Sequence, residues 1–150
     1  MKLNEITIEV TQQCPNRCIY CSSLSDLEKT EAMDIKTVRR VVDDAKALGA
    51  TIVSLSGGEP FLRNDIAEIV DYIYAQGLKI RLYSSGIYFS DGQYTSIPAT
   101  LLEAVKDKIE ALIFNYETSD ANLYATIMGT LHGCCRSQST RLRGLSVPMS

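Results

Sequence analysis

Three cysteines with a C-x3-C-x2-C spacing, Cys14, Cys18 and Cys21, are the residues of this chain that most clearly indicate chemistry. Cysteine thiolates hold iron–sulfur clusters in proteins, and a cubane 4Fe–4S cluster has four iron corners. Three thiolates would leave one iron without a protein ligand. Because an open coordination position separates a metal centre that reacts from one that only stabilises a fold, the spacing predicts a reactive iron–sulfur site.

The same cysteines also allow a zinc site, which would need a fourth ligand such as His132, Cys134 or Cys135. Short zinc sites usually combine two Cys-x2-Cys pairs, so the spacing favours the iron–sulfur interpretation. Cys134 and Cys135 also leave open an auxiliary cluster. Five cysteines are an odd number, and three of them are clustered, which in a reducing compartment indicates metal binding more than a disulfide framework.

Length and composition restrict the class of protein. The chain has 150 residues, of which 45% are hydrophobic, so it is long enough for one globular domain with a core. Its net charge of −3 gives no indication of a nucleic-acid or membrane partner. The N-terminus lacks the apolar segment of a signal peptide, and no apolar stretch is long enough to cross a bilayer. We therefore expect a cytoplasmic protein without nucleic-acid or membrane partners.

Hydrophobic periodicity predicts strands that alternate with helices along most of the chain. The order βαβαβαβα predicts parallel strands joined by right-handed crossovers, and the segment 87–98 is interpreted as a longer loop. The predicted strands cover 5–11, 51–55, 78–83 and 109–115, and the predicted helices cover about 34–48, 64–77, 99–106 and 119–127.

The strand pattern refines the fold class. Apolar residues such as Ile8 and Ile80 occupy one face of the first and third strands, and polar residues such as Glu9, Lys79 and Arg81 occupy the other. A filled barrel would not place so many polar side chains inside, so the pattern predicts an open, partial TIM-like barrel with a polar cavity. The alternatives are that these strands have one solvated face and that Lys79 and Arg81 pair with Glu9.

Polar segments follow all four predicted strands. In parallel α/β folds, sites lie at the carboxyl ends of the strands, so we expect these segments to meet at one rim. Two glycines would let a ligand approach the backbone, and Glu59 could accept hydrogen bonds from an ammonium group, although a plain strand-to-helix turn is the alternative. Arg63 is expected to pair with Asp65 near the start of the helix, and binding of an anionic group is the alternative. The segments are the cysteine run, Gly57–Pro60, Ser84–Gly86 and Asn115–Glu117.

The combination of motifs resembles the radical S-adenosylmethionine (radical SAM) superfamily over about residues 3–130. The cysteine run follows the first strand, Tyr20 precedes its last cysteine, and Gly-Gly-Glu-Pro follows the second strand. The resemblance is to the branch that modifies peptides or builds the molybdenum cofactor. It implies a 4Fe–4S cluster that reductively cleaves S-adenosylmethionine to a 5′-deoxyadenosyl radical, which abstracts hydrogen from a peptide or small-molecule substrate. It also implies an electron donor such as flavodoxin or ferredoxin.

The resemblance also implies the roles of individual residues. Cys14, Cys18 and Cys21 would bind the cluster, and Tyr20 would place its backbone near the adenine. The segment Gly57, Gly58, Glu59 and Pro60 would contact the methionine ammonium group. The ends of the third and fourth strands would reach the carboxylate or ribose through Ser84, Ser85 and Asn115. No amino-acid side chain is expected to act as acid or base, because the cluster and S-adenosylmethionine carry the chemistry.

The chain differs from the family in its number of repeats. Radical SAM cores usually have six βα units, whereas residues 1–130 offer four, and residues 131–150 have no strand or helix period and are expected to be disordered. We therefore expect the N-terminal part of a core domain, either truncated or altered in reading frame near residue 134. The alternatives are a catalytically incomplete iron–sulfur fragment and a non-enzymatic electron carrier.

Overall fold

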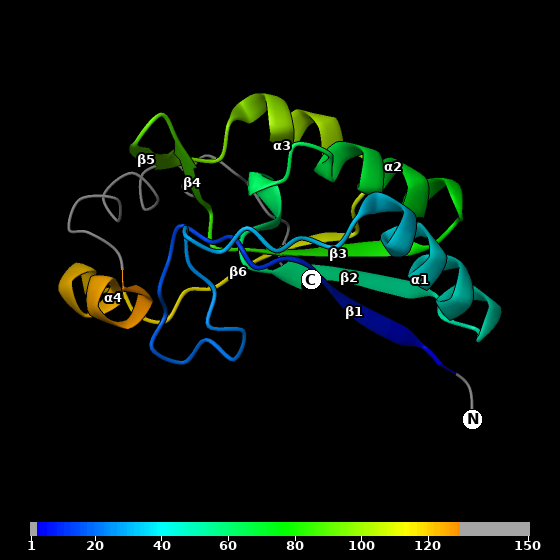
Figure 1. Cartoon of the computed structure of the whole chain (residues 1–150), viewed down its shortest axis with the longest axis horizontal. Helices are drawn as coiled ribbons and strands as arrows, with labels where there is room; N and C mark the ends of the chain where they lie inside the picture. Colours follow the sequence, from blue (N-terminus) through cyan, green and yellow to red (C-terminus); the bar gives the residue numbers. More distant parts are fainter. Residues whose placement is uncertain (1–2, 130–150) are drawn as a thin grey trace.

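The structure is a computed structural model that describes residues 3–129. Its centre is a parallel sheet with the strand order β1-β2-β3-β6, so each strand lies beside the one that precedes it in the repeat (Figure 1). The predicted α/β class with a parallel sheet is therefore confirmed. The strands are β1 (Glu5–Thr11), β2 (Ile52–Gly57), β3 (Lys79–Ser84) and β6 (Ala111–Phe114).

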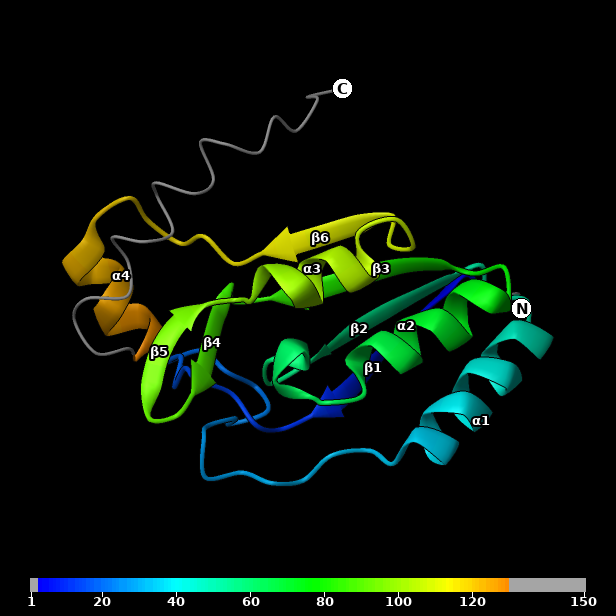
Figure 2. The same cartoon turned by 90° about the horizontal axis from the view of Figure 1, so that it is seen from above.

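Three helices lie on one face of this sheet: α1 (Ile35–Ala47), α2 (Ile66–Ala75) and α3 (Ala99–Val105) (Figure 2). A short 3-10 helix, η1 (Pro60–Leu62), connects β2 to α2. The helix α4 (Ala121–Met128) lies beyond the carboxyl end of the sheet, near the loop that follows β1 (Figure 1). The other face of the sheet is not covered by any helix of the described residues (Figure 1).

The core forms between the sheet and these helices because the predicted apolar face of each strand is buried. Ile8, Val10, Ile80 and Leu82 are between 0% and 3% exposed and pack with the apolar sides of α1 and α2. The start of α1 is also as predicted, because the Asp34 side chain accepts a hydrogen bond from the Thr37 backbone N–H at 3.0 Å. The sequence pattern therefore places the layers correctly.

The predicted loop at 87–98 is wrong, because it contains a two-stranded antiparallel hairpin of β4 (Ile87–Ser90) and β5 (Gln93–Ser96). The two turn residues between the strands, Asp91 and Gly92, have φ angles of 53° and 73°. Two positive φ angles in a two-residue turn are typical of type I′ hairpins, which favour Asp-Gly. The Asp-Gly pair between two short runs of aromatic and β-branched residues was the sequence signal for this hairpin.

The polar face of the sheet holds ion pairs, although not with Glu9, the partner given by the alternative interpretation. Arg81 Nη1 lies 3.0 Å from Glu5 Oε2, and Lys79 Nζ lies 2.5 Å from Glu110 Oε1. Glu9 instead accepts a hydrogen bond from the Ser23 hydroxyl at 2.7 Å. The two cations are therefore satisfied near the amino ends of the strands, away from the rim.

Arg63 has the predicted structural role. Its side chain is 8% exposed, forms a two-pronged ion pair with Asp65 at 2.7 Å, and donates to the carbonyl oxygens of Val10 and Met33 at 2.5 and 2.7 Å. We expect Arg63→Ala to lower the free energy of unfolding by about 2–3 kcal/mol, because it removes charge-assisted bonds and leaves two carbonyls unpaired. Urea unfolding measures this change.

The matched control for Arg63 is Arg40→Ala. Arg40 is 84% exposed and its i,i+4 partner Asp44 lies at 3.8 Å, so its loss should change the free energy of unfolding by less than about 0.5 kcal/mol. Equal effects of the two substitutions would contradict the structural role of Arg63.

The residues predicted to form an irregular tail, 131–150, lie outside the described residues, as do His132, Cys134 and Cys135. None of the helices between residues 3 and 129 combines the length and hydrophobicity that crossing a membrane requires.

Candidate cofactor site

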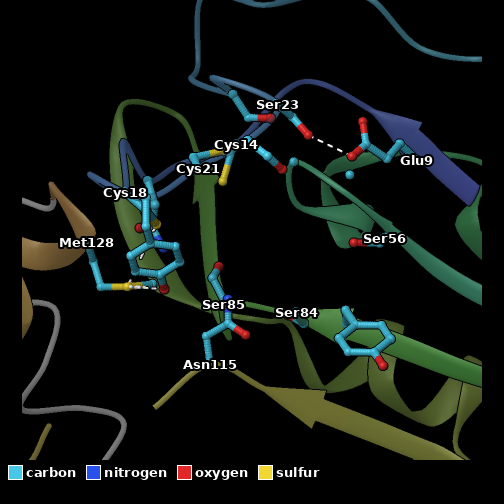
Figure 3. Close-up of a pocket in the computed structure, with 17 residues that line it drawn as sticks. Glu9, Cys14, Cys18, Cys21, Ser23, Ser56, Ser84, Ser85, Asn115 and Met128 are labelled. Atoms are coloured by element: carbon cyan, nitrogen blue, oxygen red, sulfur yellow. Dashed lines mark hydrogen bonds between the residues drawn. The ribbon is translucent and has the colours of Figure 1, made fainter. Parts of the chain in front are cut away.

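The loops that follow all four strands of the parallel sheet line one cavity of about 260 Å³ (Figure 3). The loops therefore meet at one rim of the sheet, as the sequence predicts. Nine of the eleven residues predicted for the site line this cavity, together with Ser56 and Tyr83 at the ends of β2 and β3. The nine are Cys14, Cys18, Tyr20, Cys21, Gly57, Gly58, Ser84, Ser85 and Asn115.

The cysteine loop is held by backbone hydrogen bonds. The Gln12 N–H donates to the Glu31 carbonyl at 2.8 Å, and the Cys14 N–H donates to the Asp26 carbonyl at 3.0 Å. The Cys21 N–H donates to the Cys18 carbonyl at 3.0 Å, which forms a tight turn between the second and third cysteines. Because these bonds fix the loop at both ends, Cys14 and Cys21 point into the cavity (Figure 3).

The three cysteines are free thiols, and burial raises the pKa of two of them. Burial raises the pKa of Cys14 to about 12, against a smaller opposing effect of a hydrogen bond from the Asn16 backbone. Burial, followed by the charge of Cys21, also raises the pKa of Cys18. Cationic iron stabilises thiolates strongly, so three clustered and partly desolvated thiols fit a site for a metal cluster.

Within residues 3–129, no group of three or more His, Cys, Asp or Glu side chains is arranged to hold a single metal ion. In a cubane cluster each cysteine binds a different iron, so the ligands of a cluster need not converge on one point. The zinc ligands proposed as alternatives, His132, Cys134 and Cys135, lie outside the described residues.

Gly57 and Gly58 bring the end of β2 against the end of β1. The Gly58 N–H donates to the Thr11 carbonyl at 2.6 Å, and a Cβ at Gly58 would lie 2.1 Å from the Gln13 carbonyl oxygen. A Cβ at Gly57, whose φ is +123°, would lie 2.3 Å from the Thr11 carbonyl oxygen. The backbone that approaches these glycines most closely is thus the segment leading into Cys14, and both glycines also line the cavity.

Glu59 and Pro60 do not line the cavity, since both are buried beneath it. The Glu59 carboxylate is 0% exposed and accepts hydrogen bonds from the Ser84 hydroxyl at 2.9 Å, from the Ser85 hydroxyl at 2.6 Å and from the Ser85 N–H at 2.8 Å. It also accepts from the Phe61 N–H at 3.2 Å. Glu59 therefore fixes the end of β3, and its predicted contact with an ammonium group stays a prediction.

Burial raises the pKa of the Glu59 carboxyl above its ordinary value of 4.5, although hydrogen bonds from Ser85, Ser84 and Phe61 act in the opposite direction. A carboxyl with a raised folded pKa contributes stability that is present below its unfolded pKa and lost as the pH rises through the folded pKa. We expect Glu59→Gln to gain stability relative to the unsubstituted chain as the pH rises above the ordinary carboxyl pKa of 4.5, as measured by urea unfolding.

Glu110→Gln is the control of opposite sign. The hydrogen bond from Lys79 lowers the pKa of Glu110, so its contribution to stability is present above its unfolded pKa. This variant should be less stable than the unsubstituted chain above pH 4.5, and the difference should shrink as the pH falls below 4.5. If the stability of both variants, relative to the unsubstituted chain, changed with pH in the same direction, the account of Glu59 would be contradicted.

Helix α4 contributes a residue that sequence analysis missed. Met128 is 0% exposed, and its Sδ lies 3.7 Å from the Cys18 sulfur and 3.4 Å from the Tyr20 hydroxyl oxygen (Figure 3). The Arg17 N–H donates to the Met128 carbonyl at 3.0 Å, and the Tyr20 hydroxyl also donates to Glu117 at 3.0 Å. The end of α4 thus holds the middle of the cysteine loop.

Two further missed residues, Asn16 and Ser25, line the cavity and are 1% and 4% exposed. Their side-chain polar atoms have no hydrogen-bond partner among the described residues. Buried polar groups are nearly always paired, so the cavity offers polar atoms to a ligand. Asn16 lies within the cysteine run, but its residue type alone gave no reason to single it out.

The family of the chain follows from a comparison with protein-family models. The model described as "Radical SAM superfamily" matches residues 8–132. The chain belongs to the radical SAM superfamily. Members of this superfamily use a 4Fe–4S cluster together with S-adenosylmethionine, and the donor set of the cavity fits such a pair.

Curated relatives include proteins named PqqA peptide cyclase. The chain is 39% identical over 104 residues to that of Methylobacterium sp. (strain 4-46) and 33% identical over 106 residues to that of Xanthomonas campestris pv. campestris (strain B100). These matches cover 69% and 70% of this chain, but only 27% and 28% of those proteins. The chain thus spans about a quarter of the length of these relatives.

Solved structures share the fold. Streptococcus suis SuiB bound to S-adenosylmethionine aligns with a TM-score of 0.72 at 22% identity, over 93% of this chain and 30% of that one. BtrN in complex with AdoMet and 2-DOIA aligns with a TM-score of 0.58 at 20% identity, over 91% of this chain and 56% of that one. At these identities the likeness establishes the radical SAM fold and not the substrate.

Proposed function

We propose that this chain is the cofactor-binding part of a radical SAM enzyme that modifies a peptide. The observation that carries the proposal is that three free thiols and the carboxyl ends of four parallel strands line one cavity. Residues 1–130 are proposed as the N-terminal portion of the radical SAM core, in line with the family match over residues 8–132.

The chain's own residues bind and orient the cofactors. Cys14, Cys18 and Cys21 would hold a 4Fe–4S cluster through their thiolates. The backbone of Gly57 and Gly58 forms part of the cavity wall beside it, where S-adenosylmethionine would lie. The remaining contacts to S-adenosylmethionine come from Tyr20, Ser84, Ser85 and Asn115, with Glu59 and Pro60 behind them.

The bound cluster and S-adenosylmethionine together supply one-electron cleavage of a carbon–sulfur bond and hydrogen-atom abstraction from the substrate. The protein must keep water from this chemistry and hold the reacting groups in place. Glu59 fixes Ser84 and Ser85 from below, and Met128 covers Cys18 from the side of α4. The electron comes from an external donor such as flavodoxin or ferredoxin.

A peptide is the proposed substrate because the names or titles of a curated relative and of a solved structure both mention a peptide. Curated relatives are named PqqA peptide cyclase, and SuiB has been solved bound to the precursor peptide SuiA. A small-molecule substrate is the alternative, and we place the protein in the cytoplasm.

Anaerobic reconstitution with iron and sulfide tests the proposal. The chain is loaded, reduced with dithionite and mixed with S-adenosylmethionine, and 5′-deoxyadenosine is measured by liquid chromatography. We expect about four iron and four sulfide per chain and production of this nucleoside. A loaded cluster without cleavage would favour an electron carrier or an incomplete fragment, and bound zinc in place of iron and sulfide would overturn the proposal.

A further inference from the structure

The Asn16 side chain is a buried amide without a protein partner at the cysteine end of the cavity. It is 1% exposed, and neither Nδ2 nor Oδ1 has a hydrogen-bond partner among residues 3–129. It lines the same cavity as Cys14, Cys18 and Cys21. Leaving a buried donor and acceptor unpaired is costly, so this amide is expected to meet its partner in the cavity.

The position of Asn16 restricts what that partner is. Asn16 lies two residues after Cys14 and two before Cys18, and it lines the same cavity as both cysteines. The ligand that Cys14, Cys18 and Cys21 would bind is therefore the nearest one to this amide. An amide N–H donates, and thiolate and sulfide sulfurs accept.

We propose that the Asn16 side-chain amide donates a hydrogen bond to a sulfur atom of the cluster held by Cys14, Cys18 and Cys21, and thereby raises its reduction potential. The proposal rests on the proposed function, since it requires a cluster at these cysteines. It makes Asn16 a cofactor-binding residue, in addition to those that the motif indicates.

The physical reason is the charge that reduction adds. One electron from an external donor makes the cluster more negative, and that charge spreads over its sulfur atoms. A hydrogen bond to sulfur therefore stabilises the reduced cluster more than the oxidised one, and its loss makes the reduction potential more negative.

The test compares Asn16→Leu, which has nearly the same volume and no polar atoms, with Asn16→Asp, which keeps the shape but offers no N–H. Asn64→Leu, at an exposed amide outside the cavity, is the matched control. Each chain is reconstituted anaerobically and its iron and sulfide are counted. The cluster is then titrated with dithionite and redox mediators, followed by electron paramagnetic resonance.

We expect both Asn16 variants to bind the cluster and to have a more negative midpoint potential. At the midpoint of the unsubstituted chain, the ratio of reduced to oxidised cluster in Asn16→Leu should be about fivefold lower, the size expected for one neutral hydrogen bond. Asn16→Asp should be lower still, because it adds negative charge. Asn64→Leu should not change the ratio.

A second readout needs no cluster. Asn16→Leu removes two unpaired buried polar atoms, so in the cluster-free chain it should leave the urea midpoint unchanged or raise it. A lower urea midpoint together with an unchanged potential would show that water or protein satisfies the amide, and would overturn the proposal. If the unsubstituted chain binds no cluster, it is the proposed function that fails.

Discussion

Cleavage of S-adenosylmethionine by the reconstituted chain is expected to fall to the level of a protein-free control when Cys18 is replaced by alanine. Cys18 lies between the other two cysteines, and its sulfur is part of the cavity wall beside Met128. Without it a cluster would keep two protein ligands, and solvent would reach a second iron. Because the exposure and ligation of a cluster set its potential and its retention, both cluster content and 5′-deoxyadenosine should be lost.

Matched controls separate ligand loss from a general effect of removing a thiol. Cys134→Ala and Cys135→Ala make the same chemical change outside the motif and should retain cluster and cleavage. Cys18→Ser keeps the size of the side chain, and circular dichroism of each cluster-free variant checks that it folds. Cleavage that persists in Cys18→Ala, or that disappears equally in Cys134→Ala, would show that the assignment of cluster ligands is wrong.

The parts of the fold that could be predicted are those that depend on local periodicity. Alternating residues such as Ile80 and Leu82 reveal the buried face of a strand, and Asp34 marks the start of a helix through one local hydrogen bond. The order of the elements then requires parallel strands, and parallel strands bring their carboxyl ends together. The position of the site therefore follows from short-range patterns alone.

The contacts within the site could not be predicted, because they join residues far apart in sequence. Met128 meets Cys18 across 110 residues, and Glu59 receives its hydrogen bonds from the serines at the end of a different strand. A carboxylate in a glycine-rich turn gives no local sign that it will be buried. The orphaned amide of Asn16 is likewise visible only once the burial and neighbours of every polar atom are known.

The sequence interpretation of the two glycines was incomplete for the same reason. Their freedom to accept a nearby ligand was predicted, whereas the structure shows that they also accept the backbone of Thr11 and Gln13. The missed hairpin is a different kind of error, because Asp91 and Gly92 carried a local signal that was available.

Gly57→Ala is expected to lower the free energy of unfolding of the cluster-free chain by roughly 3 kcal/mol or more. Two effects add at this position. A φ of +123° is strained for any residue with a Cβ, and that Cβ would lie 2.3 Å from the Thr11 carbonyl oxygen, which is backbone and cannot rotate away. Relief requires the end of β1 to move, and Cys14 follows directly, so cluster retention after reconstitution should fall together with stability.

Two other glycines separate these effects. Gly77 has a φ of +73°, and a Cβ added there would meet nothing within 4 Å. Gly77→Ala should therefore show the cost of backbone strain alone, about 1–2 kcal/mol, and the variant should retain the cluster. Gly58→Ala has the clash with Gln13 at 2.1 Å without a positive φ, so it should lose cluster even where its unfolding midpoint changes less than that of Gly57→Ala. Urea unfolding and iron content measure the two quantities independently. If Gly77→Ala matched Gly57→Ala in both, close packing of β2 against the cysteine segment would not be what these glycines provide.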